Sequence, residues 1–144
     1  MSRFRRSTLA AALWLSVLPL AASEPENAPP PEESAVAAAT TWLSEVDAGA
    51  YGESWDHAAE LFRRAVTREN WQQALNGVRK PLGAVISREL QSATYATELP
   101  GAPDGEYVVI QFETSFAEKK NAVETITPMK DPDGAWRVSG YYIQ

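Results

Sequence analysis

The most regular pattern in the chain is an alternation of apolar and polar residues over positions 106–143, in three runs separated by two polar turns. Side chains of a strand point alternately to opposite faces, so each run is predicted as a β-strand. The turns are a polar loop at 118–121 and the sequence DPDG at 131–134, in which Pro presets φ and Gly tolerates a positive φ. The pattern therefore predicts three antiparallel strands joined by tight turns.

The two turns also predict the strand register, and with it the two faces of the sheet. A four-residue loop at 118–121 sets Ser115 opposite Glu124, and the turn at 131–134 sets Met129 opposite Trp136. The face expected to pack into the core carries Val108, Ile110, Phe112, Thr114, Phe116, Val123, Thr125, Thr127, Met129, Trp136, Val138, Gly140 and Tyr142. The opposite, mixed face carries Tyr107, Val109, Gln111, Glu113, Ser115, Glu124, Ile126, Arg137, Ser139, Tyr141 and Ile143.

Three amphipathic helices are predicted before these strands, because apolar residues recur at helical spacing. The first spans residues 34–49, the second follows residues 50–52 with an apolar stripe from Trp55 to Val66, and the third runs over residues 67–80. Residues 85–99 are predicted as a further strand, although their alternation is poor. The order of elements indicates an α+β fold, with three N-terminal helices packed on one face of a four-stranded antiparallel meander.

The N-terminal region predicts export. Residues 1–23 combine a basic start, a short apolar run and small residues at the end, which is typical of a cleavable signal peptide. The apolar run is shorter than the ~20 residues of a membrane span. An Arg5-Arg6 pair keeps twin-arginine export open beside ordinary secretion. We therefore expect a periplasmic or secreted protein, with an extended, acidic, Pro-rich leader at residues 24–33 and one domain at residues 34–144.

The amino-acid composition disfavours several kinds of partner and metal site. The chain has 13 Lys and Arg against 19 Asp and Glu, a balance that disfavours nucleic acids and anionic membranes as partners. With one histidine and no cysteine, the usual zinc ligand sets are missing. The DPDG turn lacks the later bidentate acid of a calcium loop. No metal and no cofactor are predicted.

Several segments of the chain resemble a known bacterial family, the domain of unknown function numbered 4019. They are Trp42-Leu43, Asp47, Gly49, Tyr51, Ser54-Trp55, Arg79, Pro81-Leu82-Gly83, Ser87-Arg88, residues 99–109, Val123-Glu124-Thr125 and residues 136–143. The resemblance covers nearly all of the chain after the leader. It implies a small exported protein, similar in element order to the cone-shaped α+β folds of the nuclear transport factor superfamily. That superfamily includes isomerases, dehydratases and non-catalytic binding domains, so the resemblance implies no single activity.

A ligand, if one binds, is expected between the helices and the core face of the sheet. The candidates are Asp47, Tyr51, Trp55, Arg79, Phe112, Thr125, Trp136 and Tyr142. The predicted core face offers hydroxyl groups and no carboxylate, which argues against acid–base catalysis, and no catalytic residue is assigned. The favoured function is a non-catalytic domain that binds a small ligand or an envelope protein. The alternatives are a small-pocket lyase or isomerase, using Asp47, His57 or a core-face Tyr, and a structural or stress-linked interaction protein.

The mixed face of the predicted sheet is more apolar than a solvated face would be. Aromatic and aliphatic residues set around an Arg are typical of a partner surface. Its predicted members are Tyr107, Val109, Glu113, Glu124, Ile126, Arg137, Tyr141 and Ile143. The sequence therefore predicts a homodimer that forms through this face.

Overall fold

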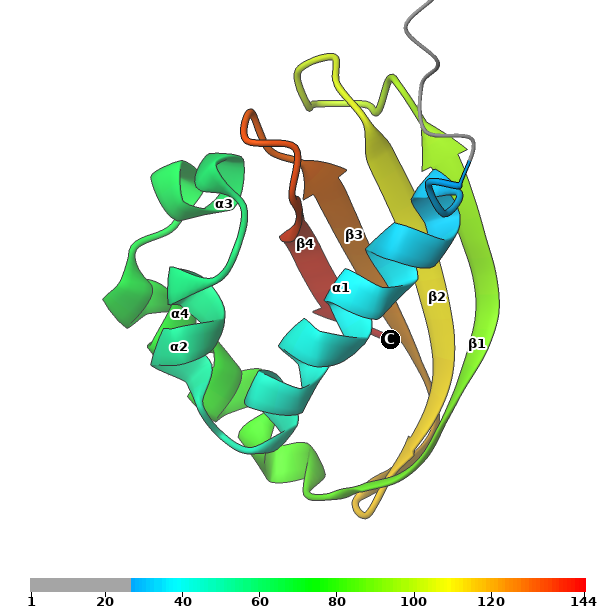
Figure 1. Cartoon of the computed structure of the whole chain (residues 1–144). Helices are drawn as coiled ribbons and strands as arrows, with labels where there is room; N and C mark the ends of the chain where they lie inside the picture. The colour runs from blue at the N-terminus through cyan, green and yellow to red at the C-terminus, as the bar shows by residue number, and fades with distance from the viewer. Residues whose placement is uncertain (1–26) are drawn as a thin grey trace, which may run out of the picture.

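The computed structural model describes residues 27–144, in which a single antiparallel sheet follows a group of helices. The sheet has the order β1-β2-β3-β4, and Figure 1 shows the four strands curving together beneath α1. Its strands are β1 (Val85–Ala96), β2 (Tyr107–Phe116), β3 (Lys119–Lys130) and β4 (Trp136–Ile143). The predicted α+β fold and the four-stranded meander are confirmed.

The helices cover one face of the sheet and its β4 side. The longest, α1 (Pro31–Asp47), crosses the sheet and contacts all four strands, while the others gather beyond β4 (Figure 1). They are α2 (Tyr51–Asp56), α3 (Glu60–Ala65), α4 (Arg68–Val78) and the short 3₁₀ helix η1 (Lys80–Leu82). The core between α1, α4 and the sheet contains Ala35, Ala39, Trp42, Leu43, Val46, Trp71, Leu75, Val108, Ile110, Phe112, Ile126 and Val138.

Helix α1 begins at Pro31, three residues before the predicted start. Proline suits the first helical turn, where its missing N–H has no intrahelical partner, and Glu32 and Glu33 lie near the positive end of the helix dipole. The last residues of the predicted leader are therefore helical. The predicted signal peptide and the first part of the leader lie outside the described residues.

The predicted second helix is wrong, because the structure divides it into α2 and α3. Between them the Ala59 N–H donates to the Val138 C=O over 2.8 Å, so this segment pairs with the outer edge of β4. An edge strand leaves backbone groups unpaired, and this bond satisfies one of them. The third predicted helix corresponds to α4, and Thr67 caps its first turn, since Thr67 Oγ1 accepts from the Asn70 N–H at 3.2 Å.

The predicted register between β2 and β3 is wrong. Phe116 pairs with Lys119 around a two-residue turn, whereas Thr114 pairs with Ala122, so β3 contains an extra residue near Asn121. Asn121 adopts a φ of 58°, a left-handed conformation that asparagine tolerates better than most residues. The two-residue turn and the bulge together shift the partner of Glu124 by three residues, from Ser115 to Phe112. A shift by an odd number of residues reverses the two faces of a strand.

A second bulge changes the end of β4. Thr127 pairs with Gly140 but Pro128 pairs with Val138, which leaves Ser139 as the extra residue. Val138 is buried as predicted, while beyond the bulge Tyr141 turns inward, with its ring 5.4 Å from that of Trp42 in an edge-on contact. Tyr142, predicted in the core, is instead 53% exposed.

Within residues 27–144, no helix combines the length and the apolar character that crossing a membrane requires.

Candidate functional site

A buried carboxylate in the middle of the sheet forms the centre of a polar network. Glu124 of β3 is fully buried. Its Oε1 accepts from Arg88 Nε at 2.7 Å and from Thr114 Oγ1 at 2.5 Å. Its Oε2 accepts from Arg88 Nη2 at 3.2 Å and from the Tyr141 hydroxyl. Because Arg88 lies on β1, Thr114 on β2 and Tyr141 on β4, this one side chain links all four strands.

The network continues to the C-terminal end of α1. Arg88 binds Asp47 through two nitrogens, with Nη1 2.7 Å from Oδ2 and Nη2 3.0 Å from Oδ1. Arg79 Nη2 lies 3.2 Å from the same Oδ1, and its Nη1 donates to the Gly83 C=O at 2.7 Å. The Arg79 guanidinium also stacks over the Phe116 ring, 4.6 Å from its centre, where a cation–π attraction adds to the ion pair.

Two carboxylates and two guanidinium groups make this network electrically balanced. Burial alone would lower the pKa of Arg88, but hydrogen bonds and charge interactions with Asp47 and Glu124 outweigh it and raise that pKa. Burial, followed by the charge of Glu124 and its hydrogen bond, raises the pKa of Tyr141 above its usual range. Both groups therefore stay protonated at physiological pH, and each donates its protons to carboxylates.

We call these six side chains the Glu124 network: Asp47, Arg79, Arg88, Thr114, Glu124 and Tyr141. Both oxygens of Glu124 are occupied by donors, so a substrate proton has no free lone pair to reach. The network therefore holds the fold together and orients its outer members, and it does not offer Glu124 as a general base.

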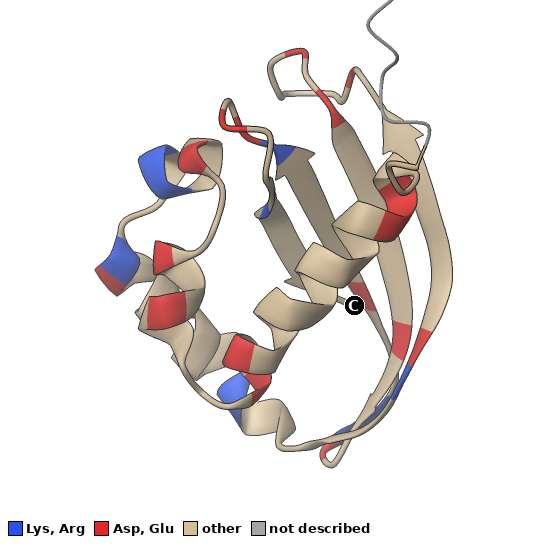
Figure 2. Ribbon diagram, in the orientation of Figure 1, with Lys and Arg blue, Asp and Glu red and all other residues tan. Residues whose placement is uncertain are grey.

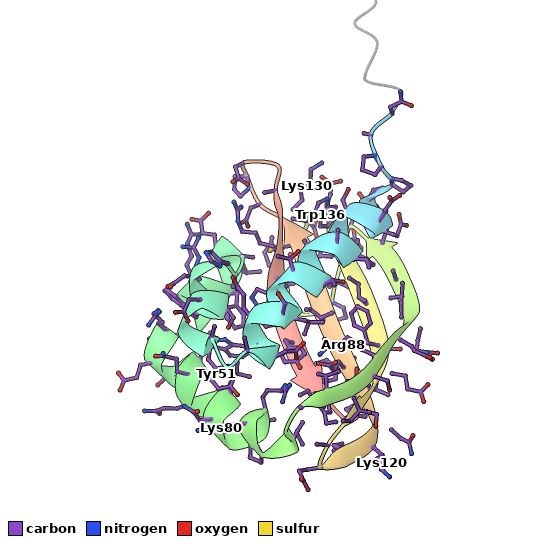
Figure 3. The ribbon with its side chains drawn as sticks, turned by 60° about the horizontal axis from the view of Figure 1, so that its bottom comes forward. Tyr51, Lys80, Arg88, Lys120, Lys130 and Trp136 are labelled. Atoms are coloured by element: carbon purple, nitrogen blue, oxygen red, sulfur yellow. The ribbon has the colours of Figure 1, made fainter. Side chains whose placement is uncertain are left out.

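A polar cavity of about 530 Å³ lies beside the network. We call it the α4 cavity, and its lining residues are Asp47, Ala48, Gly49, Tyr51, Gly52, Glu53, Gln72, Asn76, Arg79, Lys80, Gly83 and Ala84. In Figure 3, Tyr51 and Lys80 lie on the helical side and Arg88 lies on the side of the strands. Figure 2 shows acidic and basic segments close together in this region.

Local sequence explains how these groups meet. Gly49 adopts a φ of 76°, which favours glycine and lets the chain turn from α1 into α2, so that Tyr51 faces the cavity. Gln72, Asn76 and Arg79 follow one another at spacings of four and three residues, which places them on one face of α4. Arg79 is 3% exposed, and its Nε has no hydrogen-bond partner within residues 27–144.

Three of the predicted ligand residues, Asp47, Tyr51 and Arg79, come together in the α4 cavity. Gln72, Asn76 and Lys80 were missed, although the polar spacing of Gln72, Asn76 and Arg79 on a predicted helix was a usable signal. In the described part of the chain, no group of three or more His, Asp and Glu side chains is arranged to hold a metal ion.

The other predicted ligand residues lie elsewhere. The Trp55 indole donates to the Val66 C=O at 2.7 Å, and Phe112 is 5% exposed within the core. Trp136 lines a different cavity. Thr125 and Tyr142 pair with each other on the outer face of the sheet, because the two bulges reverse their predicted faces, and Tyr142 also borders a small cavity beside α4.

The predicted partner surface is wrong in its membership. Glu124 and Ile126 are fully buried, and Tyr141 and Ile143 lie on the inner face with them. On the outer face, Tyr107 is 1% exposed, because its hydroxyl donates to the Pro103 C=O at 2.6 Å and the loop covers its ring.

Of the predicted surface, Val109, Glu113 and Arg137 remain outside the core, and Arg137 is held by Asp131 and Asp133 at 3.0 and 2.8 Å. A homodimer that forms through this face stays a prediction.

A comparison with protein families shows to which family the chain belongs. A family model described as "Protein of unknown function (DUF4019)" matches residues 38–141. The chain belongs to this family. The matched segment of the DUF4019 chain contains all six residues of the Glu124 network and every residue that lines the α4 cavity. The predicted resemblance is confirmed, while the search of curated proteins found no match.

Proposed function

We propose that this DUF4019 protein binds a small polar ligand in the α4 cavity and catalyses no reaction there. The observation that supports the proposal is a polar cavity whose one wall is fixed by the Glu124 network. Its volume, about 530 Å³, lies within the range of small-molecule sites. A wall that is already ordered loses little conformational entropy on binding, so contacts made there convert well into affinity.

The lining residues indicate the chemistry of the ligand. Gln72 and Asn76 each provide both a donor and an acceptor, and the carboxylates of Asp47 and Glu53 are matched by the cations Arg79 and Lys80. A strongly charged molecule would meet groups of its own sign. We therefore propose an uncharged or zwitterionic ligand with several hydrogen-bonding groups, such as an amino acid or a small sugar.

We propose that the α4 cavity binds its ligand without catalysing a reaction, because the carboxylates of its ordered wall already accept hydrogen bonds from neighbouring side chains. Glu124 accepts four hydrogen bonds, and Asp47 accepts three from two arginines. A general base needs a lone pair within reach of the substrate proton. The remaining lining groups, which include two amides, a lysine and the carboxylate of Glu53, are proposed to orient a ligand through hydrogen bonds.

The test compares two adjacent glutamines on α4. Gln72 lines the α4 cavity, whereas Gln73 is exposed and does not. Amino acids and monosaccharides would be titrated into ¹⁵N-labelled protein, with amide shifts followed by NMR. We expect saturable shifts around α4, with an affinity lowered about five- to tenfold by Gln72→Ala and unchanged by Gln73→Ala.

Two results would contradict the proposal. One is the absence of saturable shifts at α4 for every probe, together with no retained small molecule in native mass spectrometry of protein purified from its own envelope. The other is an equal affinity for wild type and Gln72→Ala, which would place the ligand elsewhere.

Export is proposed on the sequence pattern of residues 1–23. Fractionation of cells followed by N-terminal sequencing tests it. We expect the protein in the periplasmic or secreted fraction, with Glu24 as its first residue.

A further inference from the structure

A second polar pair lies away from the α4 cavity, where α1 approaches the end of α2. His57 follows α2, and its Nδ1 lies 2.6 Å from Glu45 Oε1 of α1. A carboxylate at this distance favours the tautomer in which Nδ1 keeps the proton, so the lone pair is on Nε2. Nε2 forms no hydrogen bond within residues 27–144. The His57 side chain is 65% exposed.

The His57–Glu45 pair borders a cavity of about 390 Å³, which we call the His57 cavity. Trp42, Trp136 and Val138 provide apolar surface, and Arg137 lies on the same wall. The other lining residues are Ala37, Ala38 and Thr41. Glu45 Oε2 is buried without a hydrogen-bond partner in the described chain, so this carboxylate has unused acceptor capacity.

Arg137 lines the same cavity as His57 and is held in place by ion pairs. It binds Asp131 and Asp133 of the preceding turn, with Nη2 2.8 Å from Asp133 Oδ2. The hydrogen bond from Arg137, followed by one from the Ala135 N–H, lowers the pKa of Asp133 to about 2. The other charged groups near His57, in an adjoining hollow, are Asp56, Glu60 and Arg63. The contacts of Arg137 with Asp131 and Asp133 use three of the five N–H donors of the guanidinium, so the remaining N–H groups can donate to a ligand oxygen without reorganisation of the side chain.

We infer that the His57 cavity is a proton-transfer site for neutral molecules with an aromatic or apolar body and a C–H bond next to a carbonyl group. His57 Nε2 takes the proton, and the C–H electron pair moves into the carbonyl group to give an enolate. The enolate oxygen lies toward Arg137, while the charge of the imidazolium is balanced by Glu45. The imidazolium then returns its proton to a carbon of the enolate, so the step needs no oxidant, reductant or cofactor.

In this assignment His57 is the catalytic residue, and Glu45 is a positioning residue that acts through the imidazole. The arrangement of carboxylate, imidazole and free ring nitrogen follows the general logic of an oriented base. The proposed proton-transfer site uses no residue of the α4 cavity, so the two proposals can be tested independently of each other.

The direct test uses phenylacetone, a neutral aromatic ketone, as a probe of proton abstraction. The full-length processed protein would be incubated with it in D₂O, and loss of the methylene signal followed by ¹H NMR. We expect exchange above the buffer rate, reduced about a hundredfold or more by His57→Gln. Because His57 is exposed, the variant should keep its fold, which circular dichroism would verify. Glu60→Gln, which alters a nearby carboxylate outside the His57 cavity, should leave the rate unchanged.

Either of two outcomes would overturn the inference: wild-type exchange at the buffer rate, or equal exchange by wild type and His57→Gln.

The role of Glu45 has its own readout, since the chain contains one histidine and therefore one pair of ring nitrogens to observe. At alkaline pH, ¹⁵N NMR of the wild type should show the proton on Nδ1. Glu45→Gln should weaken that preference and slow exchange by about tenfold or more. A merely structural role would change thermal stability and leave the tautomer as it was, so an unchanged tautomer would contradict the assignment.

Discussion

The Glu124 network and the His57–Glu45 pair are two ways of placing a carboxylate beside a cationic or ionisable partner. Glu124 is fully buried, and donors from the three other strands of the sheet occupy both of its oxygens. Glu45 is partly exposed, and one of its oxygens and one nitrogen of His57 have no hydrogen-bond partner in the described chain. A saturated group stabilises the fold, whereas a group with spare capacity can meet a ligand. The contrast teaches that the number of unused donors and acceptors separates the two roles better than residue type does.

The largest effect is expected from the centre of the network. Glu124→Ala would leave Arg88 charged and partly buried opposite a cavity, and the Tyr141 hydroxyl without its acceptor. Breaking a buried pair by removing one partner costs about 3–5 kcal/mol. Urea denaturation would measure the change in the free energy of unfolding. Glu113→Ala, at an exposed position of β2, should change it by less than about 0.5 kcal/mol, and equal losses for the two variants would contradict the comparison.

Two buried threonines differ in whether the side-chain hydroxyl has a hydrogen-bond partner. Thr114 Oγ1 donates to Glu124 at 2.5 Å, while Thr125 Oγ1 is buried without a hydrogen-bond partner in residues 27–144. Thr114→Val should lower the free energy of unfolding by about 1.5–3 kcal/mol, because a hydrogen bond to a charged group is lost. Thr125→Val removes an unpaired polar atom and should be neutral or stabilising. Chemical denaturation would decide, and the reverse order would show that saturation is not the deciding property.

Tyr141 predicts a loss of stability at alkaline pH. Its pKa in the folded protein is raised above the ordinary value of 10.0, chiefly by burial and then by Glu124. A raised folded pKa means that the stabilisation is complete below pH ~10 and declines as pH rises further, because the unfolded chain then loses the tyrosine proton first. Unfolding measured from pH 8 to 11 should show this decline, and Tyr141→Phe should flatten it. An identical pH dependence in the variant would exclude Tyr141 as its source.

The smallest effect is expected at His57. Its pair with Glu45 is largely exposed, and such pairs contribute little to stability because solvent screens them. His57→Gln should shift the thermal midpoint by less than about 2 °C. Calorimetry would measure the shift, and a large loss would indicate that the pair stabilises the junction of α1 and α2 instead of remaining available to a ligand.

The sequence predicted the order of the helices and strands better than it predicted which side chains lie on each face of the sheet. Periodicity and turn residues were sufficient for the helical region, the four strands and their order. The error began at Asn121, which looked like a loop residue but forms a bulge within β3. Because alternation has a period of two, that single extra residue moved Glu124 from the predicted outer surface into the interior. The argument against an acidic group on the core face failed for the same reason.

The candidate site was predictable where it depended on local spacing. Asp47 and Arg79 flank the ends of α1 and α4, and helix ends that pack together bring such residues close. The position of Arg88 could not be predicted from the sequence, because the alternation of β1 is interrupted by irregular pairing on either side of Ser87–Leu90. The pairing of Arg88 with Asp47 joins residues 41 positions apart, and no periodic signal in the chain encodes it.

The position of Glu124 has a consequence for how the domain opens. Because its donors come from β1, β2 and β4, no single strand can leave the sheet without abandoning a buried charge or hydroxyl. Partial opening would therefore lose nearly as much as complete unfolding, and intermediates with one strand detached should be scarce. Amides across the middle of all four strands should exchange with solvent together, in one cooperative event.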